Sequence, residues 1–392
     1  MIFVFLLLIS LLVLSFMCSK NNIFSPGVIT SGIWIICFLL FWILPHSLPP
    51  LRTQFLFSIS LWATLLTVSA LLVQSLFIKK SLLQAEPSVF IRNIYFWLSV
   101  ATFPHLVLFA IEAIATGTTG NWAMDLRMAA LGQTANTDGA YAGFHLLIWQ
   151  VAFIIEFFYF SRKNWWKVLI LGVIVLSLGM LTMAKITFLN MFLWIVFILY
   201  FKNKINLKQI LIGGGALFFV FVFLQVVRHN IEMDTEDKAG FLIMYVVGNM
   251  SSFDTLIPAS SQHWGENVFR LYYSVMYRFG LSDIPPTDAI LPFISEPLAT
   301  NTFSGMYPFF KDFGYWGVGI FAGVLGLIFG WIFRRAQQGD AMYILIYTVL
   351  LPAIFMQYVA EQFFTNITTY MYQMVLIGIP FVFSKYKLLQ KK

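Results

Sequence analysis

Five cations are the residues of this chain whose types and positions best suit chemistry. They are Arg127, Lys185, Arg228, Arg270 and Arg278, and each lies at the end of an apolar run or in a stretch between two such runs. Arginine binds phosphate oxygens through paired, charge-assisted hydrogen bonds, and lysine adds a point charge. An ionic group at membrane depth is costly unless it has a partner or a water-filled cavity. The cations therefore predict a diphosphate site, and a lipid-linked diphosphate suits their position beside apolar segments.

A second group of candidates surrounds Arg270. Residues 265–279 are rich in aromatics and predict a helix, in which Glu266 and Arg270 lie one turn apart and are expected to form an ion pair. His263 lies just before this helix in a polar stretch. An imidazole that titrates near neutral pH could take a proton from an attacking hydroxyl, so His263 is a candidate base.

Several classes of enzyme lack their sequence signatures here. The chain contains no HExxH, paired CxxC, Walker loop, GxSxG or glycine-rich dinucleotide motif. Cys18 and Cys37 both fall inside apolar runs, which favours packing over metal binding or a disulfide. The sequence therefore predicts chemistry without a metal or another cofactor.

The elements that position these residues are apolar helices. The 392 residues are 60% hydrophobic and 10% charged, whereas soluble domains carry about 25% charge. A spanning helix needs about 20 mostly apolar residues, and eleven runs approach or reach that length. They lie near residues 2–18, 27–45, 55–78, 93–115, 141–160, 167–184, 187–201, 209–227, 313–333, 341–360 and 368–384. We therefore expect an all-α polytopic membrane protein with about 11 transmembrane helices.

The cations also predict the orientation of the chain. Short cytoplasmic loops carry an excess of Lys and Arg. Sixteen of the 24 cations fall on one side of the eleven runs, so that side is predicted to be cytoplasmic, with the N-terminus outside and the C-terminus inside. The net charge of +7 thus reflects the Lys and Arg bias that sets the membrane orientation, and nucleic acid is not an expected partner.

This orientation divides the chain into three parts. Residues 1–227 hold the first eight helices and a small outer loop at 116–139, residues 228–312 form a large outer loop with short helices, and residues 313–392 hold the last three helices and a basic tail. The polar candidates gather on the outer face. We expect the site to lie where the large loop meets the smaller outer features that carry Arg127 and Lys185.

One stretch resembles a known family. Residues 299–317 read ATNTFSGMYPFFKDFGYWG, in which Asn301 and Phe303 are followed by Asp312-Phe313-Gly314 and Gly317 at the start of a late apolar run. This pattern and the layout of the loops resemble the Wzy-type O-antigen polymerases, which join oligosaccharide repeat units in bacterial envelopes. The chain departs from the family's spacing of an arginine, ten residues and a glycine, because Arg127 and Gly139 are separated by eleven residues and Arg270 and Gly280 by nine.

The resemblance implies a GT-C-like membrane glycosyltransferase in the bacterial inner membrane. It would polymerise undecaprenyl-diphosphate-linked repeat units at the periplasmic face, and the five cations would stabilise the leaving diphosphate without a metal. His263 or Asp312 would act on the acceptor hydroxyl. The implied partners are lipid-linked oligosaccharides, membrane lipids and a chain-length regulator protein. Sugar rings would contact Trp264, Tyr273, Tyr277, Asn301 and Tyr307.

Two other functions stay open from the residues alone. An O-antigen ligase would use the same cation cluster with a different acceptor. A flippase or transporter is the alternative from another class, with Glu112 and Glu156 as possible relay residues. Transporters usually show internal repeats and polar residues at the middle of several helices, and this sequence shows neither clearly.

Overall fold

A computed structural model gives the structure of the chain. It describes residues 1–76, 86–132, 145–228, 247–288, 291, 294 and 300–389, without the side chains of residues 225–226, 228 and 385–389. Within these ranges the chain forms helices and two isolated β-bridges, and no β-strand. The prediction of an all-α membrane protein is therefore confirmed.

Each of the eleven predicted runs coincides with a helix. Seven helices are long and apolar enough to cross a membrane, and four apolar helices are shorter. The longer ones are α2 (Pro26–Ile43), α3 (Thr53–Ser75), α4 (Val89–Ala115), α9 (Leu207–Arg228), α13 (Tyr307–Gln337), α14 (Ala341–Phe355, continued to Tyr358 by a 3-10 turn, η2) and α15 (Ile367–Leu389). The shorter ones are α1 (Ile2–Cys18), α6 (His145–Phe158), α7 (Trp165–Leu181) and α8 (Lys185–Phe201). Seven crossings are therefore supported by length, while eleven stays a prediction.

Three further helices are too short to cross. They are α5 (Trp122–Ala130), α11 (Asn249–Phe253) and α12 (Arg270–Arg278). The side chain of Asn121 caps α5 by accepting the backbone N–H groups of Ala123 and Met124, which would otherwise lack an intrahelical partner. Helix α12 is shorter than the predicted 265–279 because residues 264–268 form turns, with Gly265 at a φ of +67°.

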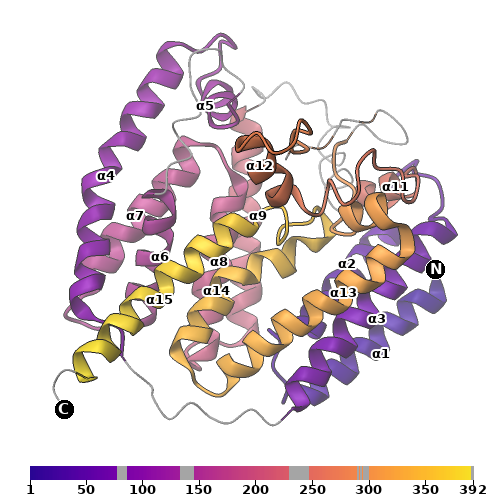
Figure 1. Ribbon diagram of the computed structural model, residues 1–392, viewed down its shortest axis with the longest axis horizontal. Helices are drawn as coiled ribbons and strands as arrows, with labels where there is room; N and C mark the ends of the chain where they lie inside the picture. Colours follow the sequence, from indigo (N-terminus) through magenta and orange to yellow (C-terminus); the bar gives the residue numbers. More distant parts are fainter. Residues whose placement is uncertain are drawn as a thin grey trace. The chain divides into compact units, whose positions relative to one another are not determined.

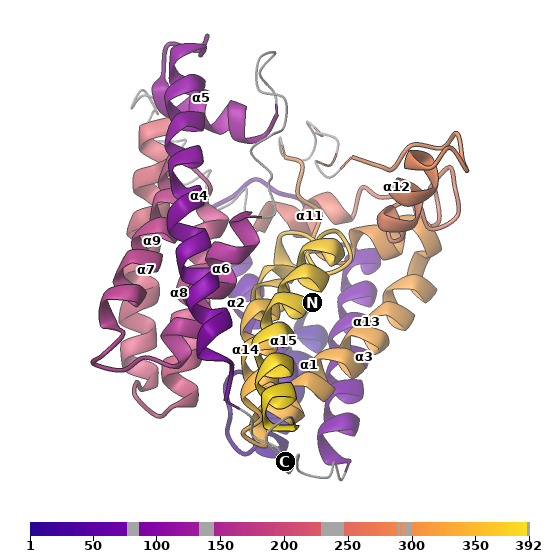
Figure 2. The ribbon, with the colours of Figure 1, turned by 60° about the vertical axis from the view of Figure 1, so that its left-hand side comes forward.

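The chain divides into two compact units. Unit 1 holds Met1–Lys80, Asp234–Tyr343 and Leu350–Tyr370, and unit 2 holds Ser81–Met233, Ile344–Val349 and Met371–Lys392. In unit 1, helices α1, α2, α3 and α13 lie side by side (Figures 1 and 2). Their contacts bury large side chains such as Trp34, Phe38 and Phe55.

Helices α3 and α13 make the closest approach in unit 1. A Cβ atom added to Gly326 would collide with the carbonyl oxygen of Leu66, and one added to Gly330 would come within 2.7 Å of the Ala70 backbone. Small residues allow membrane helices to approach closely. The glycines of α13 thus bring the helix that follows the large loop against α3.

The loop of unit 1 is tied to the helix ends. The carboxylate of Asp254 accepts the backbone N–H groups of Arg52 and Phe55 at 2.7 and 2.9 Å, at the start of α3. Burial raises the pKa of Asp254, and these hydrogen bonds oppose the shift. Residues 304 and 305 donate backbone N–H groups to the carbonyls of Val359 and Gln357. Segments far apart in sequence therefore meet at one end of unit 1.

Unit 2 is built from α4 to α9, a short segment of α14 and α15 from Met371 onward. Helix α4 packs against α6 and α7, α7 against α8, and α8 against α9. A bidentate ion pair joins Arg92 to Glu156, with both N···O distances at 2.8 Å, and the Glu156 side chain is 2% exposed. The turn predicted at Lys185 is also confirmed, because α7 ends at Leu181 and α8 begins at Lys185.

Candidate functional site

A polar cavity opens at one end of the helices of unit 1. Its volume is about 80 Å³, several times the ~10–15 Å³ that one water needs. The segment before α12, the stretch that leads into α13 and the loop between η2 and α15 all contribute to it. Figure 2 shows α12 beside the first turns of α13. The lining residues are Asn267, Arg270, Thr287, Asp288, Leu291, Ser304, Tyr307, Pro308, Ala360, Glu361, Gln362 and Thr365.

Arg270 is the cation of this cavity. Its Nε atom donates to the carbonyl oxygen of Thr287 at 2.8 Å, and the Thr287 hydroxyl donates to the carbonyl of Glu266 at 3.1 Å. Burial lowers the pKa of Arg270, and the negative charge of Asp288 opposes that shift. Thr287 thereby fixes the plane of the guanidinium, which leaves its terminal nitrogens without a hydrogen-bond partner among the described residues.

The expected ion pair between Glu266 and Arg270 is not formed. The Glu266 carboxylate instead accepts the backbone N–H groups of Gln262 and His263 at 3.0 and 3.1 Å. That prediction was wrong because Glu266 lies in the turns before α12, where one-turn helical spacing does not apply. Within the part of the chain that the structure describes, Arg92 and Glu156 form the one ion pair.

Asp312 holds the wall of the cavity in place. It accepts the backbone N–H of Asn267 and that of Val268 at 3.0 and 2.9 Å, and the side-chain amide of Asn267 at 2.6 Å. These bonds attach the segment before α12 to the first turns of α13. The predicted role of Asp312 in proton transfer remains a prediction, and its present bonds are those of a positioning residue.

Glu361 is a second buried carboxylate, and sequence reasoning missed it. One oxygen accepts the backbone N–H groups of Phe363 and Phe364, and the other accepts the backbone N–H and the hydroxyl of Thr365, at 2.7 to 3.0 Å. Burial raises the pKa of Glu361, and these four hydrogen bonds oppose the shift. A signal existed, because Glu361 is the single charged residue between Asp340 and Lys385.

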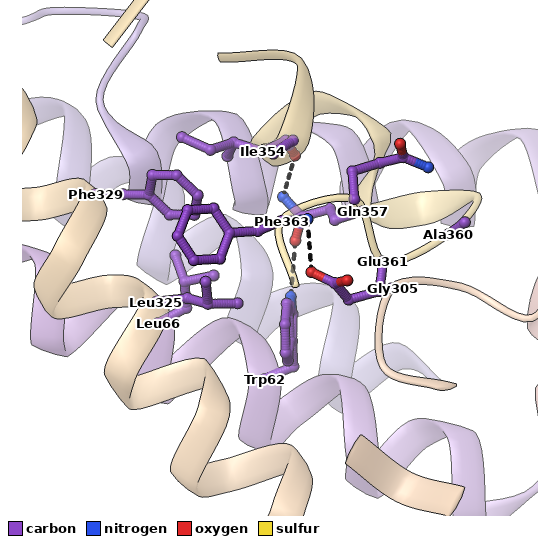
Figure 3. Close-up of a pocket in the computed structure, with 12 residues that line it drawn as sticks. Trp62, Leu66, Gly305, Leu325, Phe329, Ile354, Gln357, Ala360, Glu361 and Phe363 are labelled. Atoms are coloured by element: carbon purple, nitrogen blue, oxygen red, sulfur yellow. Dashed lines mark hydrogen bonds between the residues drawn. The ribbon is translucent and has the colours of Figure 1, made fainter. Parts of the chain in front are cut away.

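A smaller cavity of about 20 Å³ shares residues 360–362 with the first one. Figure 3 shows the Gln357 amide between Trp62 and Ile354 in its wall. Gln357 accepts from the indole of Trp62 at 2.7 Å and donates to the Ile354 carbonyl at 2.7 Å and to Thr30 at 3.0 Å. Both the oxygen and the nitrogen of the buried Gln357 amide therefore have hydrogen-bond partners, as buried polar groups require.

The other predicted residues of the large loop lie around α12. His263, Trp264, Tyr277 and Arg278 are exposed, and the Trp264 ring stacks on Phe269 with centroids 5.3 Å apart. Tyr273 is buried, and its hydroxyl donates to the Trp264 carbonyl at 2.7 Å, so it supports the turn. Burial raises the pKa of Tyr273.

Among the residues of the motif stretch, Tyr307 lines the cavity, whereas Asn301 is partly exposed and is not among its lining residues. Tyr307 is only 6% exposed. The structure thus brings Arg270 and Tyr307 to one cavity, with Asp312 acting on its wall.

Three of the predicted cations belong to unit 2. Arg127 lies on α5, Lys185 begins α8 and Arg228 ends α9, although the side chain of Arg228 is not described. Asn121, at the start of α5, donates to the carbonyl of Val227 at 3.2 Å, which places the two segments side by side (Figure 2). Helices α8 and α9 pack antiparallel across a short loop, so the start of α8 lies at the same end of unit 2 as the close of α9.

Several predictions fall outside the described residues. They include Gly139 and residues 229–246 of the predicted large outer loop. Among the described residues, no group of three or more His, Cys, Asp or Glu side chains could hold a metal ion.

The comparisons with known proteins identify no relative. No family model, curated protein or solved structure matches the chain.

Proposed function

We propose that this protein polymerises undecaprenyl-diphosphate-linked oligosaccharide repeat units at the outer face of a bacterial inner membrane. It would do so as a GT-C-like glycosyltransferase with eleven crossings, an outer N-terminus and a cytoplasmic C-terminus. The observation that carries the proposal is the position of residues 300–317, the described part of the stretch that resembles the Wzy-type polymerases. Ser304, Tyr307 and Pro308 of this stretch line the polar cavity, and Asp312 holds its wall.

In the proposed reaction, a hydroxyl of one lipid-linked glycan attacks the anomeric carbon of another. The bond from that carbon to the diphosphate oxygen breaks, the lipid diphosphate leaves, and the hydroxyl proton passes to a base such as His263. Negative charge grows on the leaving diphosphate, so preorganised cations lower the barrier. In unit 2, Arg127, Lys185 and Arg228 come from segments that meet at one end, which suits this role.

A genetic experiment tests the proposal. The gene is deleted from a strain that makes long O-antigen chains, and the lipopolysaccharide is separated by length. We expect single repeat units on the core after deletion and the full ladder after complementation. Bare core without any repeat unit would indicate a ligase or a flippase instead, and an unchanged ladder would refute all three.

The cation role is tested in the same strain. Arg127→Ala, Lys185→Ala and Arg228→Ala should each shorten or abolish the ladder at normal membrane levels of the protein. Arg162→Ala is the matched control, because Arg162 is an exposed residue of unit 2 at the predicted cytoplasmic side. A normal ladder in all three variants would refute the claim that these cations stabilise the leaving diphosphate.

A further inference from the structure

The charge of the polar cavity argues against a diphosphate inside it. One cation, Arg270, lines the cavity together with two carboxylates, Asp288 and Glu361. A third carboxylate, Asp312, is bonded to the lining residue Asn267. A diphosphate placed there would meet more negative than positive charge, and the repulsion would be strongest at the buried Glu361 carboxylate, where water screens least.

The polar groups of the cavity include both donors and acceptors. The terminal nitrogens of Arg270, the Tyr307 hydroxyl and the Gln362 Nε2 can donate, and none has a hydrogen-bond partner among the described residues. The carboxylate of Asp288 and the Oδ1 atom of Asn267 can accept. A sugar hydroxyl both donates and accepts, so it needs such a mixture, whereas a diphosphate needs donors alone.

Part of the remaining lining is apolar. Leu291, Pro308 and the ring of Tyr307 present carbon surface next to these polar groups. Binding sites for small molecules commonly combine an apolar lining with a few placed polar groups. A pyranose ring has the matching surfaces, since its C–H face is apolar and its rim carries hydroxyls.

We infer that the polar cavity binds the hydroxyl groups of a neutral sugar, so that Arg270 recognises the glycan and the lipid diphosphate is held elsewhere. This inference rests on the proposed function for the origin of the sugar. In this arrangement the carboxylate of Asp288 accepts hydrogen bonds from the sugar. Arg270 and Tyr307 donate hydrogen bonds to the sugar, and the Thr287 carbonyl fixes the orientation of the Arg270 guanidinium.

One substitution is expected to change the affinities for the two ligands, a sugar and a diphosphate, in opposite directions. Asp288→Asn removes a negative charge and a strong acceptor at an exposed position of the rim. A bound sugar should then bind about tenfold more weakly, because a hydrogen bond to a charged group is lost. A bound diphosphate should bind more tightly, because a repelling charge is gone. Asp283→Asn is the control, since it makes the same change at another exposed position of the loop.

The measurement uses the full chain in lipid nanodiscs. Saturation-transfer NMR follows glucose, galactose, N-acetylglucosamine and N-acetylgalactosamine at millimolar concentration, and a separate titration follows undecaprenyl diphosphate. We expect at least one sugar to bind, Asp288→Asn and Tyr307→Phe to weaken it, and the affinity for undecaprenyl diphosphate to stay unchanged. Tighter binding of undecaprenyl diphosphate by Asp288→Asn, or no binding of any of the four sugars, overturns the inference.

These outcomes are independent of polymerisation, because no reaction takes place in the binding experiment. A chain that binds sugar in this pattern but leaves the glycan ladder unchanged in the deletion strain would refute the proposed function and keep the sugar site. A chain that is required for the ladder but binds no sugar would refute the sugar site and keep the proposed function.

Discussion

Arg270 is held by a hydrogen bond that a lysine could not make in the same geometry. Its Nε atom donates to the Thr287 carbonyl, while its terminal nitrogens have no hydrogen-bond partner among the described residues. A lysine offers a compact ammonium on a flexible stem and loses this planar arrangement. Charge alone therefore does not describe what Arg270 contributes to the cavity.

We predict that Arg270→Lys reduces polymer formation by about tenfold or more, the scale of one lost hydrogen bond to a charged group. The length ladder of the complemented deletion strain measures it, with Arg162→Lys as the control at an exposed site. Full-length glycan from Arg270→Lys at wild-type levels would show that only the charge at this position matters.

The chemical types of the site residues were easier to predict than their partners. Arg270 and Tyr307 were expected from sequence, and both line the cavity. Glu361 was missed although it is the single charged residue between Asp340 and Lys385, because its hydrogen-bond partners, residues 363–365, lie in a loop and give no periodic signal. The partner of Glu266 was predicted wrongly, since Glu266 lies in turns and the helix that the spacing assumed begins only at Arg270.

At the scale of elements, α13 contains a sharp change of direction at Gly314. Its φ of +61° and ψ of −147° lie in a region that is essentially restricted to glycine. Gly317 follows one turn later, and an added Cβ there would collide with the carbonyl oxygen of Phe309. The two glycines of the Asp-Phe-Gly-x-x-Gly stretch thus allow the turns that hold Asp312 to depart from the line of the membrane helix.

We predict that Gly314→Ala destabilises the protein by about 1–3 kcal/mol, because alanine is strained at this backbone conformation. Gly215→Ala is the matched control, since Gly215 lies inside α9 with open space around its Cβ position, and should be neutral or slightly stabilising. Thermal unfolding of both purified variants measures the difference. Equal melting temperatures would show that the kink is not required.

The pair of Arg92 and Glu156 joins α4 to α6 within unit 2. Asn164 adds a third hydrogen bond to the Glu156 carboxylate at 2.9 Å. A carboxylate that is 2% exposed needs its partner, since an unpaired buried charge is strongly unfavourable. Arg92 is one of the sixteen cations that the charge bias places on the predicted cytoplasmic side, and its pairing could not be predicted because 63 residues separate the two positions.

We predict that Arg92→Ala lowers the stability by about 3–5 kcal/mol, the usual cost of leaving one partner of a buried pair. The double variant Arg92→Ala with Glu156→Ala should recover part of the loss, because no unpaired charge remains. Thermal unfolding and the level of protein in membranes report the result. A loss in the double variant as large as the sum of the two single losses would contradict a direct coupling.

At the scale of the whole molecule, hydropathy was sufficient to place the helices. Each predicted run coincides with a helix because lipid requires every backbone polar group to be satisfied within the segment. Helix α9 illustrates the lipid-facing case, since only 6% of its apolar window is buried and side chains such as Phe219 are 73% exposed. The cavity was not predictable in this way, since it depends on contacts between segments up to about 100 residues apart in sequence.

The most direct test of the central claim is polymerisation by the purified chain. The protein in nanodiscs is supplied with lipid-linked repeat units extracted from a strain that lacks the gene, and the products are separated by length. We predict a ladder of polymerised units and released undecaprenyl diphosphate, and no ladder from Arg228→Ala. Repeat units that remain single in the presence of folded wild-type protein would contradict the account.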